Sequence, residues 1–192
     1  AEEILAQAGG DVAAIVCGVG TGGSITGIGR VLRARLGATL KIVAVEPSGS
    51  AVLSGKEPGT HGIQGLGAGF VPANLDRALL DQVITVSDVA AERMVGRLAR
   101  EEGLLVGPSA AANVHAATLV ARDLPGRIVT LLCDSGERYL FLRGPPGGSQ
   151  RAAAGSKREK RAAYPVDRAS RFDTLNVWRD LSRLRRSASP SW

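Results

Sequence analysis

Short, continuously apolar runs alternate along the chain with longer segments in which apolar residues recur every three or four positions. The first pattern is typical of buried strands and the second of amphipathic helices. Strands are predicted within residues 11–19, 41–47, 81–86 and 126–136. Helices are predicted for residues 1–9, 22–36 and 87–103 and within 104–124. Uniformly apolar strands that alternate with helices predict the α/β class, with an open, mostly parallel sheet and helices on both of its faces.

Local signals support these boundaries. Gly9 and Gly10 end the first helix, and Ser87 and Gly103 are a typical cap and stop for the third. A long loop rich in Gly, Pro and Ser runs from residue 47 to about residue 72 and contains "HGIQGLGAGFVP".

The charge is divided unevenly along the chain. The net charge of the 192 residues is +6, but residues 1–142 carry 12 Lys and Arg against 14 Asp and Glu, and residues 143–192 carry 12 against 4. The basic character therefore belongs to the tail alone and says nothing about the folded body, which weakens a nucleic-acid-binding interpretation. The tail has no apolar period and is rich in Gly, Pro, Ser and Arg, so we expect it to be disordered.

Neither cysteine belongs to a metal or redox motif. Cys17 and Cys133 lie far apart in apolar runs, which predicts buried, reduced thiols and no metal site. Reduced thiols favour a cytoplasmic location. The absence of an apolar run of about 18 residues predicts no membrane span. No signal peptide precedes the first strand, and a start at Ala1 without methionine predicts a chain that begins within a gene or after processing.

The stretch "CGVGTGGSITGIG", residues 17–29, joins the first long strand to a helix and predicts an anion site. The first N–H groups of a helix lack partners, and glycine lets an anion approach the backbone. Hydroxyl donors are available from Thr21, Ser24 and Thr26, beside the N–H groups of Gly20, Gly22 and Gly23.

Three ligands and a purely structural turn compete for this stretch. Gly18, Gly20 and Gly23 match the dinucleotide pattern G-x-G-x-x-G, with Glu46 as a possible ribose-binding acid, so a nicotinamide-binding Rossmann module is one alternative. A nucleoside triphosphate loop is excluded because no lysine lies near. A single phosphate monoester suits the density of short donors best. Close packing of helix on strand would also explain the glycines.

Two more polar loops are predicted at the same sheet edge. In "GLLVGPSAAAN", Ser109 is predicted to begin a helix, where it either binds a ligand or acts as the N-cap. In "CDSGERYL", Asp134, Ser135 and Gly136 follow the last strand. Ligands of open α/β sheets collect at the carboxyl ends of the strands, so the three loops predict one pocket.

Five motifs in series carry a resemblance to a known family. They are "GVGTGGSITGIGRVL", "VEPSGSAVLSG", "HGIQGLGAGFVP", "EEGLLVGPSAAAN" and "DSGERYL". Together they resemble the second half of the cysteine synthases, the O-acetylserine sulfhydrylase family of fold-type-II pyridoxal-phosphate enzymes, over about residues 1–140. The related cystathionine β-synthases and diaminopropionate synthases share these loops.

The resemblance implies roles for individual residues. The loop around the cofactor phosphate is matched by Gly20, Thr21, Gly22, Gly23 and Ser24. Ser109 matches the serine that hydrogen-bonds the pyridine nitrogen. The loop on the substrate side of the cofactor is matched by Gly65, Gly67 and Gly69, and Ser135 falls near the pyridine edge. Ala111 stands where the family often has glycine, and Glu46 becomes a structural residue. His61 and His115 match no catalytic position.

The implied reaction is β-replacement of O-acetylserine by sulfide to give cysteine, in a homodimer when the enzyme is full length. A neutral serine opposite the ring nitrogen makes the ring a milder electron sink than a carboxylate would. The family's Schiff-base lysine has no match among Lys41, Lys56, Lys157 and Lys160. We therefore expect residues 1–142 to be a partial cofactor-binding domain that is inactive alone, and residues 143–192 to be an appended tail. The abrupt change of composition there resembles translation in a shifted frame, with a tail that binds RNA or an acidic surface as the alternative.

Overall fold

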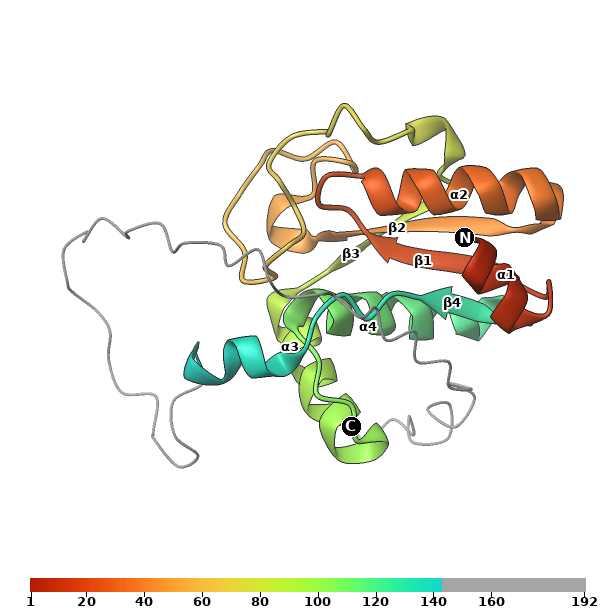
Figure 1. Cartoon of the computed structure of the whole chain (residues 1–192). Coiled ribbons are helices and arrows are strands. Elements are labelled where there is room, and N and C mark those ends of the chain that lie inside the picture. The colour runs from red at the N-terminus through yellow and green to blue at the C-terminus, as the bar shows by residue number, and fades with distance from the viewer. Residues whose placement is uncertain (143–192) are drawn as a thin grey trace, which may run out of the picture.

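The computed structural model describes residues 1–142 (Figure 1). The predictions for the basic tail, residues 143–192, concern residues outside this range.

Four parallel strands form one sheet in the order β3-β2-β1-β4. The strands are β1 (Ala14–Gly18), β2 (Lys41–Pro47), β3 (Gln82–Val86) and β4 (Ile128–Thr130). From β1 the chain adds β2 and then β3 on one side, and it returns to add β4 on the other side of β1. The direction of strand addition therefore reverses between β1 and β4, and such a switch point opens a crevice at the carboxyl ends of the strands.

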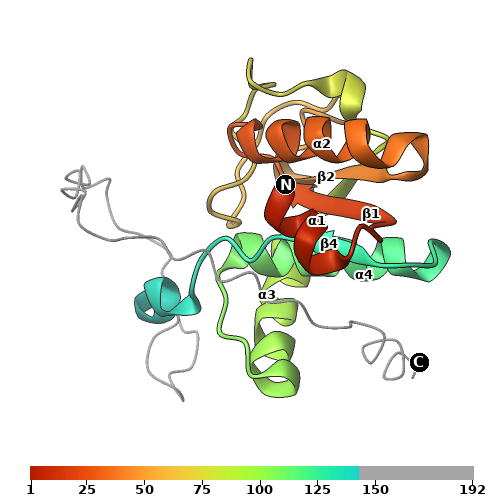
Figure 2. The same ribbon diagram turned by 45° about the vertical axis from the view of Figure 1, so that its right-hand side comes forward.

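Helices cover both faces of this sheet, as predicted (Figures 1 and 2). The α-helices are α1 (Glu2–Ala8), α2 (Gly23–Leu36), α3 (Asp88–Arg97) and α4 (Pro108–Asp123). A π-helical turn, Leu98–Glu102, prolongs α3 and ends at Gly103, and 3-10 turns occupy Gly37–Thr39, Ser48–Ser50, Arg77–Leu79 and Gly136–Leu142. Figure 2 shows α2 above the sheet and α4 below it.

Successive residues of β1 enter different cores. Ile15 and Cys17 pack with α1 and α2, whereas Ala14 and Val16 pack with the alanine-rich face of α4. All four are almost fully buried. A strand buried on both faces has no polar positions to alternate, which explains the continuous apolar runs.

Two predictions from the sequence meet different outcomes here. Ser87 caps α3, since its hydroxyl accepts a hydrogen bond from the Ala90 N–H at 3.2 Å. The predicted burial of both cysteines is right for Cys17 and wrong for Cys133, which is exposed. The reason is that β4 ends at Thr130, so Cys133 belongs to the loop beyond the strand.

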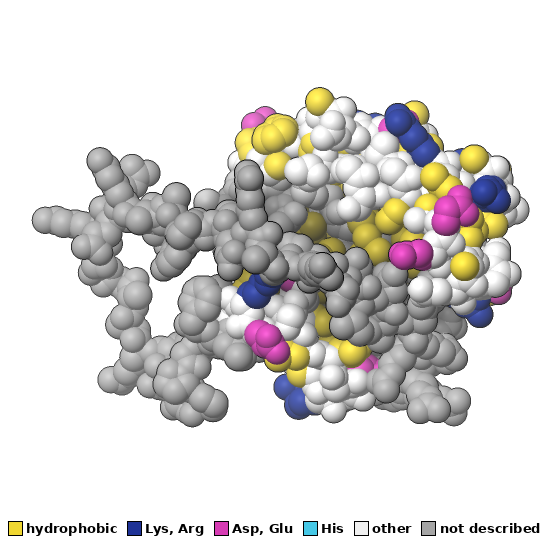
Figure 3. All heavy atoms as spheres, in the orientation of Figure 1, with side chains coloured by type: hydrophobic (Ala, Val, Ile, Leu, Met, Phe, Trp, Pro, Cys, Tyr) yellow, Lys and Arg dark blue, Asp and Glu magenta, His cyan; other side chains and the backbone are white. Residues whose placement is uncertain are grey.

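The surface of the described residues is mixed in charge. On the face shown in Figure 3, basic and acidic side chains lie interspersed, in keeping with their near balance in residues 1–142. Within that range, no helix has both the length and the apolar character needed to cross a bilayer.

Candidate functional site

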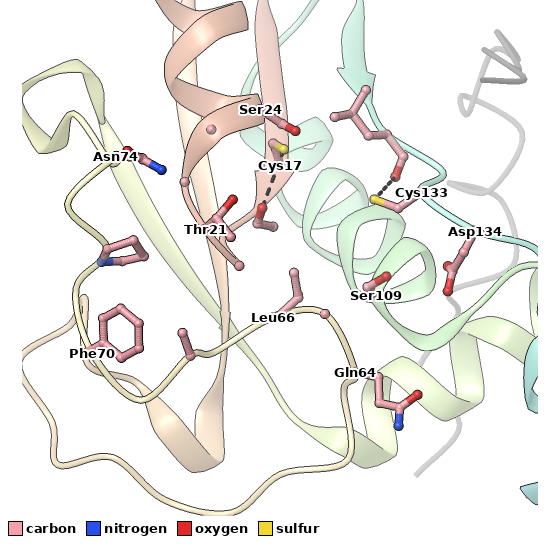
Figure 4. A pocket seen from close by; sticks show the side chains of 18 of the residues that line it. Cys17, Thr21, Ser24, Gln64, Leu66, Phe70, Asn74, Ser109, Cys133 and Asp134 are labelled. Atoms are coloured by element: carbon pink, nitrogen blue, oxygen red, sulfur yellow. Dashed lines mark hydrogen bonds between the residues drawn. The ribbon is translucent and has the colours of Figure 1, made fainter. Parts of the chain in front are cut away.

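A cavity of about 830 Å³ lies at the switch point, where β1 and β4 end. Three segments surround it (Figure 4). The first is residues 18–24, here called the glycine corner. The second, here called the Ser109 wall, lines the cavity with Ser109, Leu131, Cys133 and Asp134, and it includes the buried Asn113, which contacts Leu131 and Cys133. The third is the loop of residues 64–74.

The glycine corner depends on backbone that only glycine adopts readily. Gly22 precedes α2 with φ of 79°, and a Cβ there would lie 2.7 Å from the Cβ of Leu75. A Cβ on Gly20 would collide with the carbonyl oxygen of Gly65. The corner is thus packed directly against the 64–74 loop, and these two glycines are required by the fold.

Gly23, the first residue of α2, differs from these two. Its φ is not in the left-handed range, and the nearest atom to a Cβ built there is Thr21 Oγ1, at 3.8 Å. Gly23 lines the cavity, so a methyl group would occupy cavity space without displacing protein. The first N–H groups of α2 have no partner within the helix. An open space in front of such donors fits a phosphate group.

The three hydroxyl residues of this helix start do not behave alike. Thr21 and Ser24 are exposed and line the cavity (Figure 4). Thr26 is buried, and its hydroxyl accepts a hydrogen bond from the Asp76 N–H at 3.0 Å. The prediction that Thr26 donates to the ligand is therefore wrong, because its side chain holds the 64–74 loop and its continuation against α2.

Ser109 lines the opposite side of the cavity, where it is 5% exposed. The N-cap of α4 is Gly107 and its first residue is Pro108, so Ser109 is the second residue of the helix. The N-cap explanation of this serine is therefore wrong, and its hydroxyl serves no cap.

Asp134 fixes the entrance to α4. Its carbonyl oxygen accepts from the Gly107 N–H at 3.1 Å, and a Cβ on Gly107 would collide with its carboxylate. One carboxylate oxygen, Oδ2, accepts from the Tyr139 hydroxyl, and the other, Oδ1, is buried without a partner. Asp134 and Tyr139 line the cavity, whereas the exposed Ser135 pairs with Val106 and does not.

Both thiols line the cavity and both are protonated near neutral pH. Burial raises the pKa of Cys17 to about 12, with a smaller contribution from Cys133. Although Cys133 is exposed to the cavity, desolvation of its sulfur by the surrounding protein and the Asp134 carboxylate raise its pKa, against smaller opposite effects of hydrogen bonds from Ser109, the backbone and Asn113. Asn113 was not predicted from the sequence, although its position four residues after Ser109 puts both on one face of α4.

Of the three glycine residues in the 64–74 loop, one lines the cavity and two do not. Gly65 lines the cavity, whereas Gly67 and Gly69 do not. The Gly67 N–H donates to the Val19 carbonyl at 3.1 Å, and its own carbonyl lies 3.1 Å from Nε2 of His61. His61 thus stabilises the loop, which sequence reasoning missed.

Glu46 does not face the cavity. It is 2% exposed, and its carboxylate accepts from the N–H groups of Leu53 at 2.8 Å and Ser54 at 3.0 Å, and from the Ser54 hydroxyl at 2.5 Å. It closes the turn after β2, so it is unavailable to a ribose. This contradicts the role that the nicotinamide interpretation gave it and supports the structural one.

Neither lysine within residues 1–142 reaches the cavity, since Lys41 begins β2 and Lys56 lies in an exposed loop. In the same range, no group of three or more His, Cys, Asp or Glu side chains is arranged to hold a metal ion.

Comparison with known proteins identifies a family and its relatives. The family described as "Pyridoxal-phosphate dependent enzyme" matches residues 1–134. A cysteine synthase of Staphylococcus aureus (strain Mu50 / ATCC 700699) is 46% identical over 141 residues, which are 72% of this chain and 45% of that protein.

Solved structures agree with these sequence matches. An O-acetyl serine sulfhydrylase, isoform 3, from Entamoeba histolytica has a TM-score of 0.71 at 36% identity, covering 77% of this chain and 46% of that one. An O-acetylserine dependent cystathionine beta-synthase from Helicobacter pylori has a TM-score of 0.69 at 36% identity, covering 73% and 46%. The chain therefore spans less than half the length of these relatives.

Proposed function

Because the chain belongs to the family of pyridoxal-phosphate dependent enzymes, we propose that its cavity is the cofactor site and that the glycine corner binds the cofactor phosphate. The observation that carries this proposal is the open space at Gly23, the first residue of α2, where a Cβ would have only Thr21 Oγ1 within 4 Å, at 3.8 Å; Thr21, Gly23 and Ser24 all line the cavity. Gly20 and Gly22 shape the same corner. A compact dianion suits short hydroxyl and N–H donors gathered at a helix start.

Ser109 is proposed to hydrogen-bond the pyridine nitrogen from the opposite side. It is buried, uncommitted to a cap and lies across the cavity from the glycine corner (Figure 4). When bound, pyridoxal phosphate supplies an electron sink for elimination and replacement at the β-carbon of an amino acid. Gly65, with the loop shaped by Gly67 and Gly69, would border the substrate side, and Ser135 is assigned no direct contact because it does not line the cavity.

The parent reaction that we propose is the formation of cysteine from O-acetylserine and sulfide. The relative of 46% identity is named a cysteine synthase, and one structural neighbour is named an O-acetylserine dependent cystathionine beta-synthase. A related β-replacement that forms cystathionine is the alternative. A homodimeric, cytoplasmic full-length enzyme stays a prediction.

We further propose that this polypeptide alone does not turn over substrate. Lys41 and Lys56 lie away from the cavity, and Lys157 and Lys160 lie outside the described residues without matching the family's lysine motif. A site without an amine for covalent attachment would hold the cofactor through its phosphate and ring nitrogen only.

The test is calorimetric titration of the purified chain with pyridoxine 5′-phosphate, which has the ring and phosphate but no aldehyde. Inorganic phosphate and NADH serve as comparison ligands. The expected result is binding of pyridoxine 5′-phosphate, weaker binding of phosphate and none of NADH. Gly23→Ala should weaken both phosphate ligands at least about tenfold, because its methyl group fills the cradle while the fold has room for it.

A companion assay follows cysteine formation from O-acetylserine and sulfide. We expect none from the chain alone, and recovery only when a lysine-bearing N-terminal part of a cysteine synthase is added. Tight NADH binding that Gly23→Ala abolishes, without binding of pyridoxine 5′-phosphate, would overturn the cofactor assignment. Turnover by the unassisted chain would overturn the proposed inactivity.

A further inference from the structure

Asp134 is the only charged side chain among the described residues that line the cavity. The other titratable groups of this lining are Cys17, Cys133 and Tyr139, and burial raises the pKa of each, so all three are neutral near pH 7. The remaining lining residues present hydroxyls, amides, apolar groups or backbone alone. This part of the chain therefore gives the cavity one negative charge, which the proposed function does not use.

Hydrogen bonds hold Asp134 at the Ser109 wall. Its Oδ2 accepts from the Tyr139 hydroxyl, and its backbone carbonyl accepts from the Gly107 N–H at 3.1 Å. Gly107 is the N-cap of α4 and precedes Ser109 by two residues, so Asp134 lies at the same end of the cavity as Ser109. Figure 4 shows these two residues on one side of the cavity and Thr21 of the glycine corner on the other.

The two sides of the cavity favour charges of opposite sign. At the glycine corner, the first N–H groups of α2 and the hydroxyls of Thr21 and Ser24 favour an anion. At the Ser109 wall, the Asp134 carboxylate favours a cation or a group that carries a proton. The positive end of α4 offsets only part of this negative potential, because the first residue of that helix, Pro108, has no N–H group.

Two neighbouring groups respond to the negative charge of Asp134. Burial is the largest cause of the raised pKa of Cys133, and the Asp134 carboxylate is the next. The pKa of Tyr139 rises to about 12 through burial, the hydrogen bond to Asp134 and the charge of that carboxylate. Arg138, which is exposed and does not line the cavity, opposes this effect at Tyr139. A ligand group beside these two side chains should therefore keep its proton as well.

We propose that the charge of Asp134 makes the Ser109 side of the cavity select the cofactor ring with its nitrogen protonated. This inference rests on the proposed function of the cavity. The Ser109 hydroxyl can accept a hydrogen bond as well as donate one, so it can pair with a ring N–H group. A ring whose nitrogen keeps its proton is a stronger electron sink than the neutral serine of the resemblance implies. The cavity thus takes a ligand with a phosphate at one end and a protonated nitrogen at the other.

The test uses the 192-residue chain and pyridoxine 5′-phosphate whose ring nitrogen carries a nitrogen-15 label. The magnetic resonance signal of this nitrogen differs between the protonated and the neutral ring, so its position against pH reports the proton. In the unchanged chain, the midpoint of this titration should lie at higher pH than in the free ligand. Asp134→Asn keeps the size of the side chain and an acceptor for Tyr139, and it should lower the midpoint by about 1 pH unit or more. It should also weaken pyridoxine 5′-phosphate about tenfold near pH 7 and leave inorganic phosphate within about twofold.

Tyr139→Phe is the matched control, because it removes the hydrogen bond to Asp134 and keeps the negative charge. Its midpoint should stay near that of the unchanged chain. A shift as large as that of Asp134→Asn would show that the packing of the wall, and not the charge, sets the protonation. Binding of inorganic phosphate by each variant verifies that the glycine corner is folded.

The outcomes separate this inference from the proposed function. Suppose that the unchanged chain binds pyridoxine 5′-phosphate but does not raise its midpoint above that of the free ligand, or that Asp134→Asn leaves the midpoint unchanged. Asp134 then does not set the protonation of the ring, whereas the cofactor assignment stands. If the unchanged chain binds neither pyridoxine 5′-phosphate nor phosphate, the cofactor assignment fails and this inference fails with it. If Asp134→Asn does not fold, the comparison of bound with free ligand decides.

Discussion

The glycine corner takes its cavity-lining atoms from one stretch, residues 18–24, whereas the Ser109 wall joins the start of α4 to residues that follow β4. The corner is made of backbone and two hydroxyls. The wall depends on side chains from distant segments, as where the Asn113 amide donates to the Leu131 carbonyl and to the Cys133 sulfur. The two meet at Gly18, where a Cβ would lie 2.8 Å from Oδ1 of Asn113.

This difference separates what each region demands of the sequence. The corner needs glycine where φ is positive or where another strand of backbone comes close. The wall needs polar side chains that match one another across the fold. Substitutions in the glycine corner should lower the stability of the fold most. Substitutions in the Ser109 wall should change the orientation and reactivity of its side chains more than the stability of the fold.

The largest expected effect is on the corner. Gly22→Ala should lower the free energy of unfolding by about 2–4 kcal/mol, from a left-handed φ of 79° and a contact of 2.7 Å with Leu75. Urea denaturation followed by circular dichroism measures this. A loss below about 1 kcal/mol, less than the strain of a single left-handed residue, would show that the corner does not depend on the special backbone of Gly22.

The next effect concerns the hydroxyls of the same helix start. Thr21→Ala and Ser24→Ala should each weaken pyridoxine 5′-phosphate by about 1–3 kcal/mol, the value of a hydrogen bond to a charged group. Thr26→Val is the matched control, because that hydroxyl serves Asp76 at 3.0 Å and not the cavity. It should reduce stability by about 1 kcal/mol and leave affinity unchanged. Unchanged affinity in Thr21→Ala and Ser24→Ala together would contradict the phosphate assignment.

The wall should respond more weakly to the loss of its buried amide. Asn113→Leu removes the donor to the Leu131 carbonyl, but it also removes the unpartnered Oδ1. The two effects partly offset, so we expect a loss of about 1–2 kcal/mol in stability. The hydrogen bond from Asn113 lowers the pKa of the Cys133 thiol, so its loss should raise that pKa and slow the alkylation of Cys133 by iodoacetamide at a fixed pH. A loss as large as that of Gly22→Ala would erase the contrast between the two regions.

The same contrast explains which features of the fold and of the site could be predicted from the sequence. The four strands, the covering helices and the glycine corner were predicted because apolar runs, glycine and helix caps act over a few neighbouring residues, as Ser87 shows. The cofactor was predicted through the resemblance and agrees with the family match. The particular roles of Ser109, Gly65 and their neighbours stay predictions.

The predictions that were wrong, and the contacts that were not predicted, depend on how separate segments pack together. Thr26 was assigned to the ligand because its type and spacing match those of Ser24, and only the packing of Asp76 against α2 turns it away. The exposure of Cys133 depends on β4 ending three residues earlier than its apolar run. Asn113 and His61 have partners 18 and 6 residues away, and neither bond follows from a local pattern.

The smallest expected effect is the most informative about the corner. Gly23 is adjacent to Gly22, yet its φ is ordinary and the nearest atom to a new Cβ is 3.8 Å away. Alanine also restricts the unfolded chain more than glycine does, so Gly23→Ala should change the unfolding free energy by no more than about 0.5–1 kcal/mol, and in the stabilising direction. Denaturation in urea, run beside Gly22→Ala, gives the comparison. A stable Gly23→Ala protein that no longer binds phosphate would mean that Gly22 serves the fold and Gly23 serves the ligand. A destabilised Gly23→Ala protein would mean that both glycines serve packing, and the open space in front of α2 would lose its claim to be a binding site.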